Sequence, residues 1–348
     1  MSDLLQSKKP LKVAVLCGWE GAERQVSLHS GRAVSDALRA AGAEVIECDI
    51  RPGAIDILND STIDLFFLAL HGQFGEDGQI QAILSAKRLT YTGSGPEASR
   101  RAFDKRLSKN IFVTAGIKTP KSIEFDGKAD SKKLQAELAY IAEKFVIKPA
   151  TQGSSVGVSI VVGAKAAVKA AKKCVKEFGN CIIEEFISGR ELTVGIVDGK
   201  VLPIIEIKSK SDFYDYNAKY IDERTEFIFD SITDDDIKSK IDTTAMKCFK
   251  ALGCRDFARI DFILADDSVL YAIELNTIPG FTTHSLLPMA ASRAGISMSQ
   301  LCMLIVSAAF RNAPPRHRIK KPEVPLTCVS QLDNSKRNIN PHLGNTNL

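Results

Sequence analysis

The first hundred residues alternate between short apolar runs and a segment with helical spacing. The pattern predicts strands at residues 12–17, 44–49 and 64–70 and a helix at residues 24–41. This order predicts a βαβ unit, in which parallel strands form one sheet flanked by helices. Ligand groups in such sheets lie on loops at the carboxyl ends of the strands. The glycine-containing loops at residues 18–27 and 71–78 are therefore candidates for a site, although ordinary turns explain either loop alone equally well.

The rest of the pattern predicts a second body of strands and helices that begins near residue 119. The predicted strands lie at 145–148, 158–162, 181–187 and 190–207, the last with a two-residue hairpin turn at 198–199. The predicted helices lie at 102–116, 164–178, 234–252, 286–294 and 298–310. Residues 208–226 have no clear period and contain three tyrosines, which is typical of a functional loop such as a lid. The proline-containing, basic and Asn-rich end predicts a poorly ordered tail, and a partner-binding arm is the less favoured alternative.

Two apolar runs, residues 257–264 and 269–276, predict a β-hairpin around a polar tetrad. Because side chains alternate between the faces of a strand, polar and apolar groups would separate. The predicted polar face consists of Arg259, Asp261, Glu274 and Asn276, and the predicted apolar face of Ile260, Phe262, Tyr271, Ile273 and Leu275. Carboxylates on neighbouring strands repel each other unless a hard cation such as Mg²⁺ lies between them. A solvated polar face is the alternative, but four polar groups interrupting such apolar strands favour a metal site.

A glycine- and serine-rich loop at residues 150–157 follows Lys148 and separates two predicted strands. Its backbone N–H groups and hydroxyls could surround phosphate oxygens, and the lysine could add positive charge. The G-x-x-x-x-G-K-[ST] pattern is absent and the loop opens no helix, so it would act as a flexible hairpin lid over phosphates. A plain glycine-rich hairpin explains the loop about equally well. Residues 184–187 could offer backbone groups to a purine and Glu191 could bind a ribose, although glutamates at sheet edges are usually just solvated.

Composition limits the classes of function. The chain has 348 residues, 45% of them hydrophobic and 25% charged, which is typical of a globular protein of two or three domains. Its net charge of +4 is small, so no nucleic-acid partner is expected. The first ten residues lack the apolar core of a signal peptide and no stretch reaches spanning length, so we expect a cytoplasmic protein without membrane insertion. Eight cysteines without a CxxC pair indicate free thiols.

Ten motifs, spread over about residues 12–312, are highly specific in combination. In chain order they read AERQVSLHSG, ALHGQFGEDGQIQ, YTGSG, FDKRLSK, VIKPATQGSSVGVS, GRELTVGI, FYDYNAKY, RIDF, ELNTIPGFTTHSLLPMAA and GISMSQL. The order and spacing resemble those of D-alanine:D-alanine ligases in the ATP-grasp superfamily. This resemblance implies an α/β fold. A parallel-sheet βαβ domain at residues 1–101 would precede two α+β ATP-grasp subdomains, 102–190 and 191–312, that clamp ATP, and a disordered tail would follow at 313–348.

The resemblance implies an enzyme that phosphorylates the carboxylate of one D-alanine with ATP. The amine of a second D-alanine then attacks the acyl phosphate, which gives D-alanyl-D-alanine for peptidoglycan and releases ADP and phosphate. Two Mg²⁺ ions, for which Mn²⁺ could substitute, would act as Lewis acids for phosphoryl transfer. The family also implies a homodimer whose partners in solution are D-alanine and ATP.

The same resemblance implies a binding role for each matching residue. The implied ATP-binding residues are Lys105, Lys148, Gly153, Ser154, Ser155, Glu184, Phe186, Ile187, Glu191 and Lys219. The implied metal ligands are Asp261, Glu274 and Asn276. His71 would lie in the substrate-binding loop, and Ser285 with Leu286 would hold the carboxylate of the second D-alanine.

Five residues acquire catalytic roles from the resemblance. Glu23 would hold the ammonium group of the first D-alanine. Arg259 and the backbone of Gly280 would stabilise the oxyanion of the tetrahedral intermediate. Tyr220 would form a hydrogen-bonded link with Glu23 and Ser154 that closes the site to water.

Two departures from the family pattern affect the first loop. Trp19 stands where a glycine is usual, and Gln25 stands where a second glutamate is common. Two alternatives to dipeptide synthesis remain at this point. A related ligase could use D-lactate or D-serine as the acceptor, although Tyr220 favours dipeptide formation within the family. A non-catalytic ATP-binding regulator is the other alternative, and it would be expected to lack Arg259 or a metal ligand, all of which are present.

Overall fold

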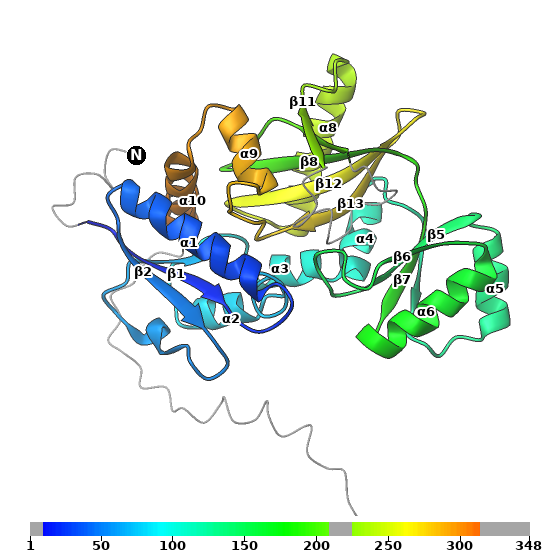
Figure 1. Ribbon diagram of the computed structural model, residues 1–348, viewed down its shortest axis with the longest axis horizontal. Coiled ribbons are helices and arrows are strands. Elements are labelled where there is room, and N and C mark those ends of the chain that lie inside the picture. The colour runs from blue at the N-terminus through cyan, green and yellow to red at the C-terminus, as the bar shows by residue number, and fades with distance from the viewer. Residues whose placement is uncertain (1–9, 209–224, 314–348) are drawn as a thin grey trace, which may run out of the picture. The chain divides into compact units, whose positions relative to one another are not determined.

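Three β-sheets organise the protein in the computed structural model, which describes residues 10–208 and 225–313 (Figure 1). Lys219 and Tyr220 lie outside the described residues, as does nearly all of the predicted tail. The mixture of one parallel sheet and two antiparallel sheets with helices confirms the predicted α/β class.

The N-terminal sheet is parallel and has the strand order β2-β1-β3. Its elements are β1 (Lys12–Gly18), α1 (Arg24–Ala40), β2 (Glu44–Ile50), a 3₁₀ helix η1 (Asp56–Asn59), β3 (Leu65–Leu68) and α2 (Gln79–Ala86). Alternate side chains of β1 enter two different cores. Val15 packs in the core that contains residues of α1, whereas Leu16 packs in the core that contains residues of α2. The predicted βαβ unit is confirmed.

The helix predicted at residues 102–116 is two helices, so that prediction was wrong. The first helix, α3 (Pro96–Phe103), ends before Asp104, and the second, α4 (Lys105–Thr114), begins after it. Asp104 has a ψ of 105°, outside the helical region, and its side chain accepts a hydrogen bond from the backbone N–H of Arg106. This N-cap outweighs the continuous helical spacing of the sequence. Consequently Lys105 is the first residue of α4, and its backbone N–H donates to the carbonyl of Ala150 at 2.9 Å.

The second sheet is antiparallel with the order β4-β7-β5-β6, and two helices cover one of its faces (Figure 1). Its elements are β4 (Ser122–Phe125), α5 (Ser131–Ala139), β5 (Lys144–Pro149), β6 (Ser159–Val162), α6 (Ala164–Phe178) and β7 (Cys181–Glu185). β5 and β6 pair with Ile147 opposite Ser159, so the glycine-rich loop connects two strands as predicted. β4 and α5 were not predicted, because each is short and carries little periodicity.

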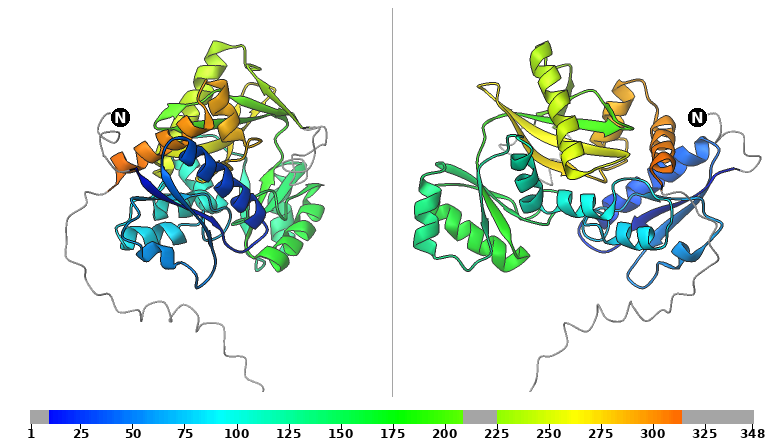
Figure 2. Two further views of the ribbon diagram at one scale, coloured as in Figure 1. Left: turned by 60° about the vertical axis from the view of Figure 1, so that its left-hand side comes forward. Right: turned by 180° about the vertical axis from the view of Figure 1, so that it is seen from behind.

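The third sheet has the order β11-β10-β8-β12-β13, with β9 paired to β8. Its elements are β8 (Gly189–Val197), β9 (Lys200–Val201), β10 (Ile205–Lys208), β11 (Glu226–Phe229), α8 (Asp235–Leu252), β12 (Phe257–Ala265) and β13 (Leu270–Asn276). α8 covers one face of this sheet (Figure 2). Asp234 caps its first turn through the N–H groups of Asp236 and Ile237, and Gly253 ends it in the left-handed conformation.

Two further helices, α9 (Leu286–Arg293) and α10 (Met298–Asn312), pack in the same core as α1 and β1. The end of the described chain therefore returns to the N-terminal sheet. Among the described residues, no single helix has both the length and the apolar composition to span a membrane. α9 and α10 meet those criteria only as a pair bent by 105°.

The apolar face predicted for the β12–β13 hairpin was partly wrong. The two strands form the predicted hairpin, but a β-bulge between Asp261 and Phe262 shifts the register, so that Asp261 pairs with Glu274 and Phe262 pairs with Ala272. Strict alternation does not continue through a bulge, because one strand carries an extra residue there. Ala272 therefore enters the core, whereas Tyr271 and Ile273 are only half-buried, and Ile273 lines a cavity.

Candidate active site

Two cavities share part of their lining along the β12–β13 hairpin. The larger, about 1020 Å³ in volume, lies between the N-terminal loops, the glycine-rich loop, the hairpin and the start of α9. The smaller, about 260 Å³, lies between β5, the glycine-rich loop, the end of β7 and the hairpin. Gly153, Glu191, Asp261 and Glu274 line both cavities. A ligand that extends from one cavity to the other would therefore pass both hairpin carboxylates.

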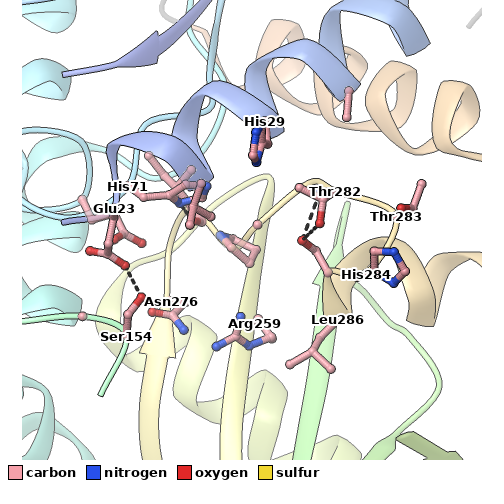
Figure 3. A pocket seen from close by; sticks show the side chains of 18 of the residues that line it. Glu23, His29, His71, Ser154, Arg259, Asn276, Thr282, Thr283, His284 and Leu286 are labelled. Carbon is pink, nitrogen blue, oxygen red and sulfur yellow. Dashed lines mark hydrogen bonds between the residues drawn. The ribbon is translucent and has the colours of Figure 1, made fainter. Parts of the chain in front are cut away.

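The predicted site residues of the described chain divide between these cavities. The larger is lined by Glu23, His71, Ser154, Arg259, Asn276, Gly280, Ser285 and Leu286 (Figure 3). The smaller is lined by Lys105, Lys148, Ser155, Glu184, Phe186 and Ile187. Residues predicted to bind amino acids thus separate from most of those predicted to bind ATP.

A hydrogen bond joins two loops across the larger cavity. Ser154 of the glycine-rich loop donates its hydroxyl to the carboxylate of Glu23, which immediately precedes α1 (Figure 3). Two glycines leave room for this carboxylate. A Cβ atom on Gly72 would lie 2.7 Å from Glu23 Oε2, and one on Gly153 would lie 2.9 Å from it. Any larger residue at either position would displace the carboxylate from the place where it meets Ser154.

The hydrogen bonds of His71 define its tautomer. Its Nδ1 lies 3.0 Å from the carbonyl oxygen of Ile278, which can only accept, so Nδ1 carries the proton. Nε2 lies 3.0 Å from Ser30 Oγ and accepts from that hydroxyl, which itself accepts from the N–H of Phe281 at 3.2 Å. Burial lowers the pKa of His71 to about 4. The imidazole is therefore neutral near pH 7 and fixes the loop at residues 71–78 to the segment that follows β13.

Glu76 is a site residue that the sequence reasoning missed, although it lies in a loop identified as a candidate. Its side chain lines the larger cavity, and its Oε2 accepts from the N–H of Gly72 at 2.7 Å. Burial, reinforced by the negative charge of Glu23, raises the pKa of Glu76 to about 8. The acidic run of the HGQFGEDG motif was the available signal.

The hairpin carboxylates lie together, as the sequence predicted. Asp261 lies opposite Glu274 in the strand register. Arg259 donates two hydrogen bonds to Asp261, at 2.9 and 2.8 Å, and Thr193 donates a third at 2.6 Å. Lys105 Nζ lies 3.4 Å from Glu274 Oε2. Cationic side chains thus neutralise both carboxylates, which limits the cost of placing them together.

The same donor set suits a hard cation. Asp261, Glu274 and Asn276 supply only oxygen ligands from the protein, the type that Mg²⁺ prefers. In residues 10–208 and 225–313, no three His, Cys, Asp or Glu side chains gather as a metal site. A cation held here would complete its coordination with water or with ligand oxygens, as Mg²⁺ usually does in nucleotide sites.

Two members of a buried triad of charges, Lys148 and Glu184, line the smaller cavity, and the third, Lys109, lies behind them. Glu184 lies between Lys148 and Lys109, whose Nζ atoms are each 2.7 Å from one of its carboxylate oxygens. Only 3% of the Glu184 side chain is exposed. Burial alone would raise the pKa of Glu184, but the attraction of the two lysines outweighs it and lowers the pKa below its usual range. The triad carries one net positive charge, which suits an anionic ligand.

The sequence predicted that Lys109 lies on a helix, but it did not predict a role for Lys109 in the site. Its Nζ also donates to Thr119 Oγ1 at 2.9 Å and to the carbonyl oxygen of Pro120 at 2.7 Å. Burial lowers the pKa of this lysine, and Glu184 only partly compensates. Its contacts join α4, the chain before β4 and β7, so no local sequence pattern indicates them.

The start of α9 forms the far end of the larger cavity. The Ser285 hydroxyl does not cap the helix but turns back, where it accepts from the backbone N–H of Thr282 at 3.0 Å. A Cβ atom on Gly280 would lie 2.6 Å from that hydroxyl, so glycine is required for this close approach. Leu286 and Thr282 lie beside the cavity in Figure 3. The helix start lacks a side-chain cap and suits a carboxylate.

Comparisons with known proteins show what the chain is similar to in sequence and fold. The family model described as D-ala D-ala ligase C-terminus matches residues 111–307. A D-alanine–D-alanine ligase from Methylacidiphilum infernorum is 40% identical over 301 residues, which cover 86% of this chain and 96% of that protein. The crystal structure of the Bacillus anthracis D-alanine–D-alanine ligase complexed with ATP is similar at a TM-score of 0.76 and 31% identity, covering 86% of this chain and 98% of that one. The VanG D-Ala:D-Ser ligase from Enterococcus faecalis has a TM-score of 0.76 at 28% identity, with 86% and 100% covered.

Proposed function

The chain belongs to the D-alanine–D-alanine ligase family, and from this premise we propose how its residues divide the reaction. It has the ATP-grasp fold and is an ATP-dependent ligase that joins two D-alanines for peptidoglycan synthesis. The single observation that carries the proposal is the pair of cavities that share the hairpin carboxylates. In our proposal the smaller cavity binds ATP, the larger binds both D-alanines, and phosphoryl transfer occurs where they share their lining.

The nucleotide would lie against the triad of charges. Lys148 and Lys105 would contact its phosphates, and the loop with Gly153, Ser154 and Ser155 would cover them. Glu184, Phe186 and Ile187 would hold the adenine, and Glu191 the ribose. The ammonium group of Lys144 lies 3.8 Å from the centroid of the Phe186 ring, a cation–π contact that orients this ring. Lys219, outside the described residues, would reach the transferred phosphate.

Asp261, Glu274 and Asn276 would hold two Mg²⁺ ions, for which Mn²⁺ could substitute. Such ions, when bound, neutralise the charge on the phosphates and on the phosphoryl group in transfer. Arg259 and Lys105, which now contact the two carboxylates, would then be available to substrate oxygens. Support for this proposal comes from the facing carboxylates and their oxygen-only donor set.

The two D-alanines would bind at neighbouring positions along the larger cavity. Glu23 would hold the ammonium group of the first, whose carboxylate accepts the γ-phosphoryl group of ATP. Ser285 and Leu286 at the start of α9 would hold the carboxylate of the second, and His71 would fix the loop between the two sites. The amine of the second D-alanine attacks the acyl phosphate carbon, the C–N bond forms, and phosphate leaves with the former carboxylate oxygen.

Arg259 and the backbone N–H of Gly280 would stabilise the oxyanion that forms during this attack. Ser154 would keep Glu23 in place, and Tyr220 would extend that link when the site closes. Glu76 lies beside these groups, and its raised pKa favours the neutral acid near pH 7.

D-Serine is the second candidate acceptor, because a D-Ala:D-Ser ligase shares the fold over 86% of this chain. We expect D-alanine to be preferred. The test measures phosphate release with ATP and Mg²⁺ while D-alanine, L-alanine, D-serine and D-lactate are added singly and in pairs, and identifies products by mass spectrometry. Turnover with D-alanine alone supports the proposal, mixed products with D-serine or D-lactate favour the alternative acceptors, and ATP binding without any turnover favours a non-catalytic regulator.

We further propose a cytoplasmic homodimer that uses D-alanine and ATP without a nucleic-acid partner or membrane insertion. Light scattering after size-exclusion chromatography of the full chain measures the mass in solution. A mass near twice 37.9 kDa is expected, and a mass near 37.9 kDa contradicts the dimer.

A further inference from the structure

Trp19 and Phe74 stack face to face and join two loops, one of which contains Glu23 and the other His71. Their ring centroids lie 3.6 Å apart and the ring planes differ by 8°. Trp19 follows β1, and Phe74 lies in the loop between β3 and α2. Both rings pack in the core that contains Ile80 of α2. The stack therefore connects two segments more than fifty residues apart, each of which carries a proposed substrate-binding residue.

Both residues have an unusual backbone conformation. The φ angles are 67° at Trp19 and 68° at Phe74, in the left-handed region that bulky side chains rarely adopt. Such conformations persist where surrounding contacts over-determine them. The backbone N–H of Trp19 donates to the carbonyl of Ile50 at 2.8 Å, and its carbonyl accepts from Arg24 at 2.8 Å. Arg24 is itself paired with Asp49 through two hydrogen bonds.

The two loops also touch directly beside the substrate cavity. The Cα atom of Gly72 comes so close to Glu23 that an added Cβ would lie 2.7 Å from its Oε2. The N–H of Gly72 in turn donates to Glu76 at 2.7 Å. A movement of one loop relative to the other by about 1 Å would therefore move Glu23 away from Ser154, and losses of catalysis by misplacement of this size are well known.

We propose that the Trp19–Phe74 stack is a positioning device that sets the affinity for the first D-alanine. It holds the loop that carries Glu23 against the loop that carries His71. The inference rests on the proposed function, because it uses Glu23 as the ammonium-binding group. Aromatic pairs contribute an interaction that corresponds to a factor of roughly 2 to 13 in an equilibrium constant. Loss of the stack therefore raises KM for the first D-alanine by roughly three- to tenfold, because fewer molecules hold the loops in the binding arrangement.

The kinetic test compares Trp19→Ala, Phe74→Leu and Trp19→Phe with the unmodified full chain. Both disruptive variants are expected to raise the first of the two Michaelis constants for D-alanine, with KM for ATP and kcat unchanged, whereas Trp19→Phe retains most of the affinity. The double variant is expected to be no worse than either single one, because both remove the same contact. Leu89→Ala is the control, because Leu89 packs against the same core outside both loops. It should lower the melting temperature without changing either D-alanine constant.

A spectroscopic test is available because Trp19 is the only tryptophan of the chain. Its fluorescence is expected to change saturably when D-alanine is added with a non-hydrolysable ATP analogue, and Phe74→Leu should alter the emission and weaken the saturation. If dipeptide forms normally and neither disruptive variant changes the first constant, the positioning role is wrong and the stack is only structural. Failure of every variant and of the unmodified chain to form dipeptide contradicts the proposed function instead. In that case the D-alanine fluorescence titration still decides on the stack.

Discussion

Lys109→Met removes one cation from the buried triad and provides a quantitative test of its role. Lys109 Nζ contacts Glu184, Thr119 and Pro120 within 2.9 Å. The substitution leaves the Pro120 carbonyl without this donor, which costs about 1–3 kcal/mol. Removing a partner from a buried ion pair costs about 3–5 kcal/mol when none remains, but Glu184 keeps Lys148. We therefore expect the free energy of unfolding to fall by roughly 3 kcal/mol in total.

ATP binding is expected to weaken in the same variant. Lys148 would then be the only lysine of the triad that pairs with Glu184. If the Lys148 ammonium group moves to a phosphate of ATP, the buried carboxylate loses its last lysine partner from the triad. A rise in KM for ATP of about tenfold corresponds to about 1.4 kcal/mol, a modest fraction of that cost. Urea unfolding measures the stability, and phosphate release at saturating D-alanine measures KM.

A matched control and a ranking make this prediction refutable. Lys169→Met removes an exposed lysine from α6 and should change stability by less than about 0.5 kcal/mol. Glu184→Gln should be more damaging than Lys109→Met, because it leaves two buried ammonium groups without their anion. If Lys109→Met matches the control in both stability and KM for ATP, or if Glu184→Gln is the milder change, the triad does not act as described.

Three further predictions concern the larger cavity. Ser154→Ala removes the donor to Glu23, so KM for D-alanine should rise by about tenfold, and KM for ATP should rise less because only one hydroxyl of the loop over the phosphates is lost; equal changes in both would contradict this. Glu274→Gln should increase the Mg²⁺ concentration needed for half-maximal phosphate release by at least about tenfold, and an unchanged requirement would place the metal elsewhere. In the unfolded chain His71 gains a proton below about pH 6.5, whereas in the folded protein, with a pKa of about 4, it stays neutral until the pH is much lower. The free energy of unfolding should therefore fall by about 3 kcal/mol as the pH is lowered from about 6.5 to about 4, and His71→Gln should show a weaker pH dependence when urea unfolding is measured over that range.

The sequence was a reliable guide where the determinants are local. The apolar runs that became β1, β12 and β13 have a clear length and period, and all three strands lie within a few residues of their predicted bounds. Polar residues on one face of a strand remain together in any packed sheet, so the placement of Asp261 and Glu274 on one face could be anticipated. The roles proposed for the residues that bind D-alanine, by contrast, came from the resemblance of motifs and could not have been derived from their spacing.

Sequence reasoning failed where a single residue changes the geometry or where contacts are distant. Asp104 divides a helix by capping its second half, and the bulge after Asp261 redirects Ile273 towards a cavity. Lys109 meets Glu184 only after α4 and the second sheet have packed, so its role has no local signal. The stacking of Trp19 on Phe74 likewise depends on the arrangement of two loops in three dimensions.

The bonds of His71 also bear on the order in which the protein is made and folded. His71 contacts Ile278 across 207 residues of sequence, and Ser30 contacts Phe281 across 251 residues. During synthesis from the N-terminus, the first βαβ unit is complete long before these partners exist. The acceptor end of the cavity can form only after β13 and the segment beyond it have emerged from the ribosome. A chain that ends before Ile278 would thus contain the loops of Glu23 and His71 without the segment that fixes His71, so fragments of this kind should not bind D-alanine.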